Sequence, residues 1–266
     1  MTTCIVDAFT DVPFKGNPAG VCLPDAPLES STMLDIAREL GLSETAFVQR
    51  AGDAFSIRYF SPKMEIPLCG HATLASAKVV FERFGLSEVC FMTDGGLTLE
   101  IRQHDGRIEM AFPVYETHPA QAPPALLEAL GIDRIENAAF NEETQILLLE
   151  IADARQLGEL APDSEALVRS YEGINGVLVT APGVDGYDFQ SRYFWPWSGT
   201  LEDPVTGATH TFLAPYWSER LGKTTMRSFQ ASERTGAMEV VLTDGGLLIR
   251  GEAVIVFEGW LRSPLA

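Results

Sequence analysis

Two stretches of the sequence are copies of each other. Residues 55–62 (FSIRYFSP) and residues 189–196 (FQSRYFWP) are identical at five of eight positions. The similarity continues after a short insertion, because residues 65–70 (EIPLCG) align with residues 202–207 (EDPVTG). Such self-similarity means that one supersecondary unit occurs twice, so each half of the chain is expected to form the same structure.

The hydrophobic pattern of each half predicts one buried helix with strands around it. Apolar residues occupy nearly every side of residues 70–84 and 207–221, and a glycine follows each segment. Alternating apolar and polar residues, as in residues 97–102, predict antiparallel strands. The prediction is an α+β fold of two pseudo-symmetric halves, residues 1–117 and 118–266, each an antiparallel barrel-like sheet wrapped around a central buried helix. Whether the last strand packs back toward the N-terminal half is left open.

The charge balance excludes several classes of partner. The 266 residues contain 19 Lys and Arg against 37 Asp and Glu, which gives a net charge of −18. A field of this sign repels nucleic acid and anionic lipid surfaces. No apolar run reaches the length of a membrane-spanning helix. We therefore expect neither a nucleic-acid nor a membrane partner.

The cysteine content and the N-terminal residues suggest a reducing compartment. Four cysteines without a C-x-x-C pair are too few to cross-link a chain of this length. The N-terminus shows no basic and apolar leader segment. We expect a cytoplasmic protein with neither disulfides nor a structural zinc site. The cysteines are Cys4, Cys22, Cys69 and Cys90.

Each copy places a proline-containing loop before the glycine that opens its predicted helix. The N-terminus of a helix carries partial positive charge and unpaired N–H donors, so residues 70–73 and 207–210 are candidate carboxylate-binding segments. Two such segments facing one another would bind a small anionic molecule. The alternative is that Gly70 and Gly207 only permit close packing at the start of a helix.

Four blocks, in order along the chain, resemble the phenazine-biosynthesis isomerase (PhzF-like) family. They are D-A-F-T at 7–10 with G-N-P-A-G-V at 16–21, L-S-E-T-A-F at 42–47, L-C-G-H-A-T at 68–73, and E-D-P-V-T-G at 202–207. The resemblance implies a diaminopimelate-epimerase-like fold of two pseudo-symmetric halves with the site between them. It also implies a homodimer.

The resemblance implies a reaction and assigns three residues to it. Relatives isomerise dihydro-3-hydroxyanthranilate by moving a proton between ring carbons, without a metal or an organic cofactor. By motif match, Glu44 is the acid/base residue, while His71 and Asp203 hold polar groups of the substrate and stabilise the shifted enol. A poorly solvated pocket would raise the pKa of Glu44 toward neutrality, whereas nearby helix N-termini would lower it.

Each of these residues also has a structural explanation. Glu44, expected in the loop after a helix over residues 32–40, is one acidic residue among many. Asp203 precedes a proline and can shape a turn, and His71 can be a first-turn residue satisfied by the backbone. His210 is expected on the second buried helix in a structural role.

The remaining candidates are residues expected to contact the substrate. They are Cys69, Gly70, Thr73, Thr206, Gly207, Ala208 and Thr209. Diaminopimelate epimerases use two opposed thiols, but the repeat partner of Cys69 is Thr206 and the second half contains no cysteine. Cys69 is therefore expected to be a small residue that lines the pocket.

Two departures from the family pattern concern the identity of the substrate. Ala208 stands where relatives often have a substrate-binding serine, and Thr235 replaces a glycine. The leading hypothesis is a cofactor-independent isomerase or epimerase acting on a small carboxylate-bearing metabolite. One alternative is a non-catalytic small-acid binding or interaction protein on the same scaffold. Another is thiol chemistry at Cys69.

Overall fold

The chain divides into two units. The computed structural model describes residues 1–262. Unit 1 contains Met1–Ala111 and the described part of Ile249–Ala266, and unit 2 contains Phe112–Leu248. The division therefore falls a few residues before the expected boundary at 117/118, and the last strand, β18 (Ala253–Trp260), belongs to unit 1.

The strands of unit 1 pair in the order β18–β1–β2–β3–β4–β6–β7–β8. Their bounds are β1 (Thr2–Ala8), β2 (Asn17–Leu23), β3 (Glu44–Ala51), β4 (Ala54–Phe60), β6 (Glu88–Thr93), β7 (Thr98–His104) and β8 (Arg107–Phe112). The short strand β5 (Glu65–Ile66) pairs with β4.

Two of these pairings correct the expectation of an antiparallel sheet. β2 pairs with β3 in parallel, and β4 pairs with β6 in parallel. A parallel pair needs a long crossover connection. The helix α1 (Ser30–Leu40) connects the first pair, and α2 (Gly70–Phe84) lies in the connection of the second.

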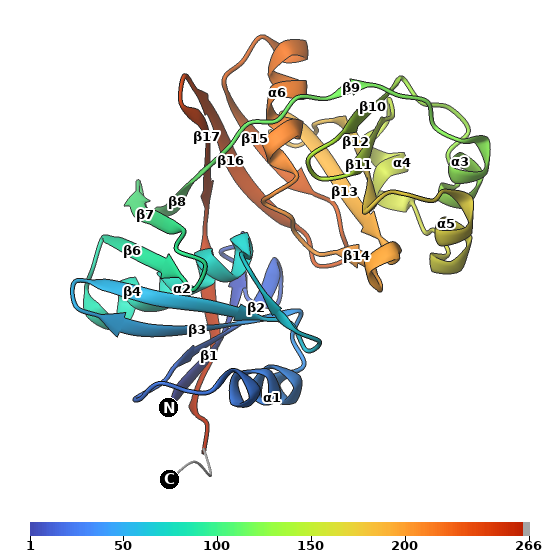
Figure 1. Ribbon diagram of the computed structural model, residues 1–266. Coiled ribbons are helices and arrows are strands. Elements are labelled where there is room, and N and C mark those ends of the chain that lie inside the picture. The colour runs from blue at the N-terminus through green and yellow to red at the C-terminus, as the bar shows by residue number, and fades with distance from the viewer. Residues whose placement is uncertain (263–266) are drawn as a thin grey trace. The chain divides into compact units, whose positions relative to one another are not determined.

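Helix α2 is the buried helix of unit 1. It spans the predicted residues and ends at Gly85, whose φ of 65° suits a glycine at a helix C-terminus. Figure 1 shows it among the strands of unit 1, and it packs against β1, β2, β3 and β18. A side chain at Gly251 would meet Phe9 at 2.7 Å and Leu74 at 2.9 Å, so a glycine is needed where the chain passes this helix.

Unit 2 is built from a second series of strands. They pair in the order β9–β10–β11–β12–β13–β15–β16, with β14 also paired to β13. Their bounds are β9 (His118–Pro119), β10 (Asn137–Asn141), β11 (Ile146–Glu150), β12 (Gly176–Pro182), β13 (Phe189–Trp195), β14 (Thr200–Asp203), β15 (Thr225–Gln230) and β16 (Gly236–Thr243). The strand β17 (Gly246–Gly251) follows and contains the boundary between the units.

The helices of unit 2 cover its sheet and supply its core. The short helices are α3 (Pro124–Leu130), α4 (Ala154–Glu159) and α5 (Ser164–Ser170), and a 3-10 turn spans Pro196–Ser198. Their apolar side chains, including Leu126, Leu157 and Leu167, pack in one cluster with residues of β11 and β12. The buried helix is α6 (His210–Leu221), which lies beside β15 and β16 (Figure 1).

The two units share an order of pairings. Along β1–β2–β3–β4–β6 the pairs are antiparallel, parallel, antiparallel and parallel. The same alternation runs along β10–β11–β12–β13–β15.

Within residues 1–262, none of the helices is long and apolar enough to span a bilayer.

The burial of α2 predicts a large energetic cost for shortening its side chains. Leu74 is 0% exposed on this helix, so Leu74→Ala should leave a cavity and lower the free energy of unfolding by about 3 kcal/mol. Leu86 is 39% exposed, so Leu86→Ala should cost less than about 1 kcal/mol. Denaturant unfolding of both variants measures the difference, and equal losses would contradict the buried position of the helix.

Candidate active site

An acidic and a basic side chain meet at the start of α2. Glu44 is the first residue of β3, not a loop residue as expected, and His71 is the second residue of α2. The Glu44 Oε2 atom lies 3.2 Å from His71 Nε2. Their side chains are 15% and 10% exposed, so the contact is largely shielded from water. The structure of unit 1 thus brings together two of the residues that the motif match singled out.

Two further side chains contact the His71 ring. The Sγ atom of Cys69 lies 3.4 Å from His71 Nδ1, and the Asn17 Nδ2 atom lies 3.4 Å from the same nitrogen. Asn17 is fully buried at the start of β2. The preceding Gly16 has a φ of +66°, and a side chain there would lie 2.2 Å from the Ala8 carbonyl oxygen. This glycine allows the close turn that brings Asn17 to the ring.

The electrostatics of this cluster favour an ion pair. Burial opposes a charge on His71, but the Cys69 sulfur and the Glu44 carboxylate outweigh it and raise the pKa of His71 well above its usual range. Burial also raises the pKa of Glu44, yet hydrogen bonding and charge attraction from His71, with help from Ser43, bring it below its usual value. Of the two opposing effects expected on the Glu44 pKa, the lowering one prevails, and its cause is the contact with His71. Both shifts favour the charged forms of the pair, carboxylate and imidazolium.

The start of α2 is fixed by hydroxyl groups. The Thr73 Oγ1 atom donates a hydrogen bond to the Cys69 carbonyl oxygen at 2.7 Å and lies 2.6 Å from the Tyr59 hydroxyl. Burial raises the pKa of Tyr59, so this phenol stays neutral. These contacts hold Cys69, Gly70 and His71 in place, and the predicted contact of Thr73 with a substrate stays a prediction.

The second predicted group of residues gathers in unit 2 around a different set of contacts. Asp203 ends β14, and its Oδ2 atom accepts a short hydrogen bond from Thr206 Oγ1. The Thr206 N–H donates to Gln230 Oε1 at 2.9 Å, and Gln230 Nε2 donates to the Asp203 carbonyl at 2.8 Å. Gln230 thus joins both ends of the Asp203–Thr206 loop.

Helix α6 starts later than the sequence predicted. It begins at His210, three residues after Gly207. The His210 N–H donates to the Gly207 carbonyl and the Thr211 N–H to the Ala208 carbonyl, at 3.0 and 3.2 Å, which are the tighter bonds of a turn. The expectation that Gly207 opens the helix is therefore wrong. Gly207, Ala208 and Thr209 form a turn ahead of the helix, and the Thr209 hydroxyl donates to the Thr206 carbonyl.

His210 is a buried neutral histidine. Its Nδ1 atom lies 3.0 Å from the Thr206 carbonyl oxygen and its Nε2 atom 2.7 Å from Ser228 Oγ. Burial lowers the pKa of His210 to about 4, although the backbone hydrogen bonds act in the opposite direction. The ring ties the start of α6 to β15, which is the structural role expected from its place in the repeat.

Residues that sequence reasoning missed are Asn17 and Gln230. Asn17 belongs to the G-N-P-A-G block that carried the resemblance, so a signal for it existed. Gln230 gave no signal beyond its place in a poorly matching segment. Among the residues that the structure describes, Glu44, Cys69 and His71 form one group of potential metal ligands, with one ligand atom from each within 4.8 Å of the others.

The comparison with protein families identifies the relatives of this chain. The profile of the phenazine biosynthesis-like protein family matches residues 6–259. The chain belongs to this family. A mouse protein described as phenazine biosynthesis-like domain-containing protein 2 is 42% identical, covering 97% of this chain and 98% of its own. A Pseudomonas aeruginosa protein described as an uncharacterized isomerase is 40% identical, covering 98% of this chain and 99% of its own.

Solved structures support the same family assignment. A PhzF family protein of Enterococcus faecalis superposes with a TM-score of 0.90 at 35% identity, covering 97% of both chains. A probable proline racemase from Agrobacterium radiobacter superposes with a TM-score of 0.64 at 13% identity, covering 99% of this chain and 94% of its own. The second likeness concerns the fold alone. The PhzF family structure and this chain thus have a mixed fold of strands and few helices, which the probable proline racemase also has.

The depressed pKa of His210 predicts an acid-dependent loss of stability. The unfolded chain binds a proton near the ordinary histidine pKa of about 6.5, and the folded chain does so only near 4. The folded state therefore loses stability as the pH falls from about 6.5 to 4, by up to about 3 kcal/mol. His210→Gln removes this titration, so the difference in free energy of unfolding between wild type and variant should shrink over that interval.

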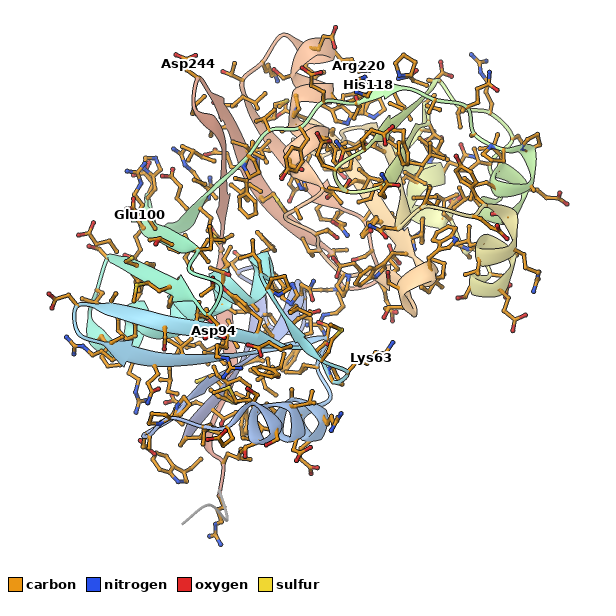
Figure 2. All side chains as sticks on the ribbon, in the orientation of Figure 1. Lys63, Asp94, Glu100, His118, Arg220 and Asp244 are labelled. Atoms are coloured by element: carbon orange, nitrogen blue, oxygen red, sulfur yellow. The ribbon has the colours of Figure 1, made fainter. Side chains whose placement is uncertain are left out.

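Denaturant titrations at several pH values measure this effect. The matched control is His118→Gln, because His118 is exposed at the start of β9 (Figure 2). This variant should follow the wild type at each pH. A constant difference between wild type and His210→Gln would show that His210 does not stay neutral in the folded chain.

Proposed function

We propose that the protein is an isomerase that moves a proton between carbon atoms of a small carboxylate-bearing metabolite without a cofactor, as in dihydro-3-hydroxyanthranilate isomerisation. The observation that carries the proposal is the shielded Glu44–His71 pair, with its oxygen and nitrogen 3.2 Å apart. A base and an acid are thereby held side by side in opposite charge states. The descriptions of bacterial relatives as isomerases support the same reaction class.

The proton transfer follows from the charge states of the pair. The Glu44 carboxylate takes a proton from a carbon beside a carbonyl or enol, and the electron pair of that C–H bond moves into the conjugated system. The His71 imidazolium donates a hydrogen bond to the oxygen where negative charge develops. Glu44 then returns its proton to a different carbon, so no proton is gained or lost.

Asp203 is proposed to hold a polar group of the same substrate. Thr206 and the 207–209 turn, which adjoin Asp203 in unit 2, are proposed to contact the substrate as well. The sequence repeat supports this, because residues 202–207 align with residues 65–70, which lead into the segment that carries His71. Gln230 would keep the Asp203–Thr206 loop in one conformation.

A second candidate function rests on Ala208. The family's serine hydroxyl at this position is missing, and the neighbouring Thr209 hydroxyl already donates to the Thr206 carbonyl. A protein that binds small acids without catalysis would tolerate this loss. Binding of compounds without any exchange of their C–H hydrogens would favour this second function.

Replacing the proposed base should abolish hydrogen exchange. Glu44→Gln keeps the size of the side chain but removes the carboxylate that accepts the proton, so exchange should fall by at least about 10²-fold. The measurement is deuterium incorporation from heavy water, by NMR, into a panel of hydroxyanthranilate-like and amino-acid compounds. Glu100→Gln on β7 is the matched control, because Glu100 is exposed (Figure 2). Exchange by the Glu44→Gln variant at the wild-type rate would contradict the assignment of Glu44.

Asp203 is expected to affect binding more than the proton transfer itself. Asp203→Asn keeps an oxygen that accepts from Thr206 but removes the charge, so the KM for an exchanging compound should rise by about tenfold or more. The control is Asp244→Asn at the exposed turn between β16 and β17 (Figure 2). An unchanged KM and kcat in the Asp203→Asn variant would remove Asp203 from the site.

A further inference from the structure

The thiol of Cys69 is a nucleophilic group that the proposed proton transfer does not use. Cys69 is 9% exposed and directly precedes α2, whose N-terminus carries partial positive charge. Its sulfur turns to the His71 ring, with Sγ 3.4 Å from Nδ1, instead of capping the helix. A thiol in contact with a base at a helix N-terminus is a common setting of a reactive cysteine.

The His71 ring has different partners at its two nitrogens. Nε2 lies 3.2 Å from Glu44 Oε2, whereas Nδ1 has Cys69 Sγ and Asn17 Nδ2 each at 3.4 Å. Because Asn17 Nδ2 is a donor, Nδ1 of the neutral ring is an acceptor, and the ring proton is on Nε2, facing the carboxylate. Sγ is farther from Nε2, at 3.9 Å. The order is that of a nucleophile, a base and an orienting carboxylate, and it does not direct the three groups at one metal ion.

The charges around the ring favour transfer of the thiol proton to His71. Transfer from Sγ to Nδ1 leaves a thiolate and an imidazolium, whose other N–H donates to the Glu44 carboxylate. Burial lowers the pKa of His71, but Cys69 and then Glu44 outweigh burial and raise this pKa well above its usual range. The imidazolium is therefore the favoured form of the ring, and the thiol is the acidic group that lies beside Nδ1.

The other three cysteines have different surroundings. Cys4 and Cys22 are 1% and 0% exposed, and burial raises the pKa of their thiols to about 11 and about 12. These two thiols stay protonated at neutral pH. Cys90 on β6 is more exposed than Cys69. Exposure alone therefore predicts that Cys90 reacts first.

We propose that Cys69 is a nucleophile, with His71 as its base, that forms a covalent adduct with small α,β-unsaturated carbonyl compounds. The thiol proton moves to His71 Nδ1, the S–C bond forms at the β-carbon, and the electron pair of the C=C bond moves toward the carbonyl oxygen. The enolate then takes the proton from Nδ1 at its α-carbon, so the addition is redox-neutral and needs no further reactant. The choice of a conjugated carbonyl rests on the proposed function, which develops charge on the same kind of oxygen. The nucleophilic thiol itself does not rest on it.

The test measures the rate of thiol addition without any turnover. Wild-type protein reacts with N-ethylmaleimide, a small conjugated carbonyl compound, at neutral pH, and mass spectrometry of its peptides follows the label on each cysteine. We expect Cys69 to be labelled at least about tenfold faster than Cys90, because its thiol has a base and Cys90 has only the greater exposure. Labelling of Cys90 as fast as Cys69, or faster, would refute the nucleophile.

A variant tests the role of His71. His71→Gln keeps a polar side chain but cannot take the thiol proton, so labelling of Cys69 should slow at least about tenfold. The control is His118→Gln, exposed at the start of β9 (Figure 2), which should leave that rate unchanged. Unfolding of a variant cannot imitate this result, because it would expose Cys4 and Cys22 and speed their labelling.

The outcomes separate this proposal from the proposed function. An unchanged rate of Cys69 labelling in His71→Gln would overturn the role of His71 as the base. Neither labelling result depends on hydrogen exchange, which the Glu44→Gln variant tests. A failure of the thiol reaction therefore leaves the proposed isomerase standing, and a failure of hydrogen exchange leaves the reactive thiol standing.

Discussion

The buried charge pair of Glu44 and His71 is the interaction on which the rest of the site depends. A lone buried charge is costly, and removal of either partner would leave the other uncompensated. The pair is therefore stable only while β3 and the start of α2 are held at a fixed separation. The hydroxyl contacts of Thr73 and the glycine turn before Asn17 meet that requirement. The packing that fixes α2 against β3 is thus also what keeps Glu44 and His71 in contact.

Much of the fold could be predicted from local pattern. Apolar residues on all sides of residues 70–84 predicted a buried helix, and the glycine at position 85 predicted where it ends. The structure has α2 with these bounds. The parallel pairing of β2 with β3 was missed, since periodicity does not reveal the direction of a partner strand. The late start of α6 was missed as well, because turn hydrogen bonds of Gly207 and Ala208 replace the first helical turn.

The candidate site was predictable only where residues formed a motif. Glu44 lies in the block at residues 42–47, and Cys69 and His71 lie in the block at residues 68–73. Unit 1 brings these three side chains together. Asn17 lies in a block of the resemblance, but its contact with His71 is 54 residues away in sequence, and the partners of Gln230 are 24 and 27 residues away, so no spacing rule indicates these contacts. The direction in which the Glu44 pKa shifts could not be predicted either. It depends on the 3.2 Å contact with His71, whose effect exceeds that of burial.

The duplication preserved a structural device while its chemistry changed. Under the repeat, Thr73 corresponds to His210, and each side chain hydrogen-bonds the carbonyl four residues earlier, on Cys69 and on Thr206. The contact with this carbonyl is therefore made by a hydroxyl in unit 1 and by a neutral imidazole ring in unit 2. The bidentate ion pairs Arg58–Glu65 and Arg192–Glu202 also recur at equivalent places, at 2.6–2.8 Å. These shared contacts hold both loops, yet the first leads to the histidine that pairs with Glu44 of β3, and the second carries a carboxylate bound to a hydroxyl.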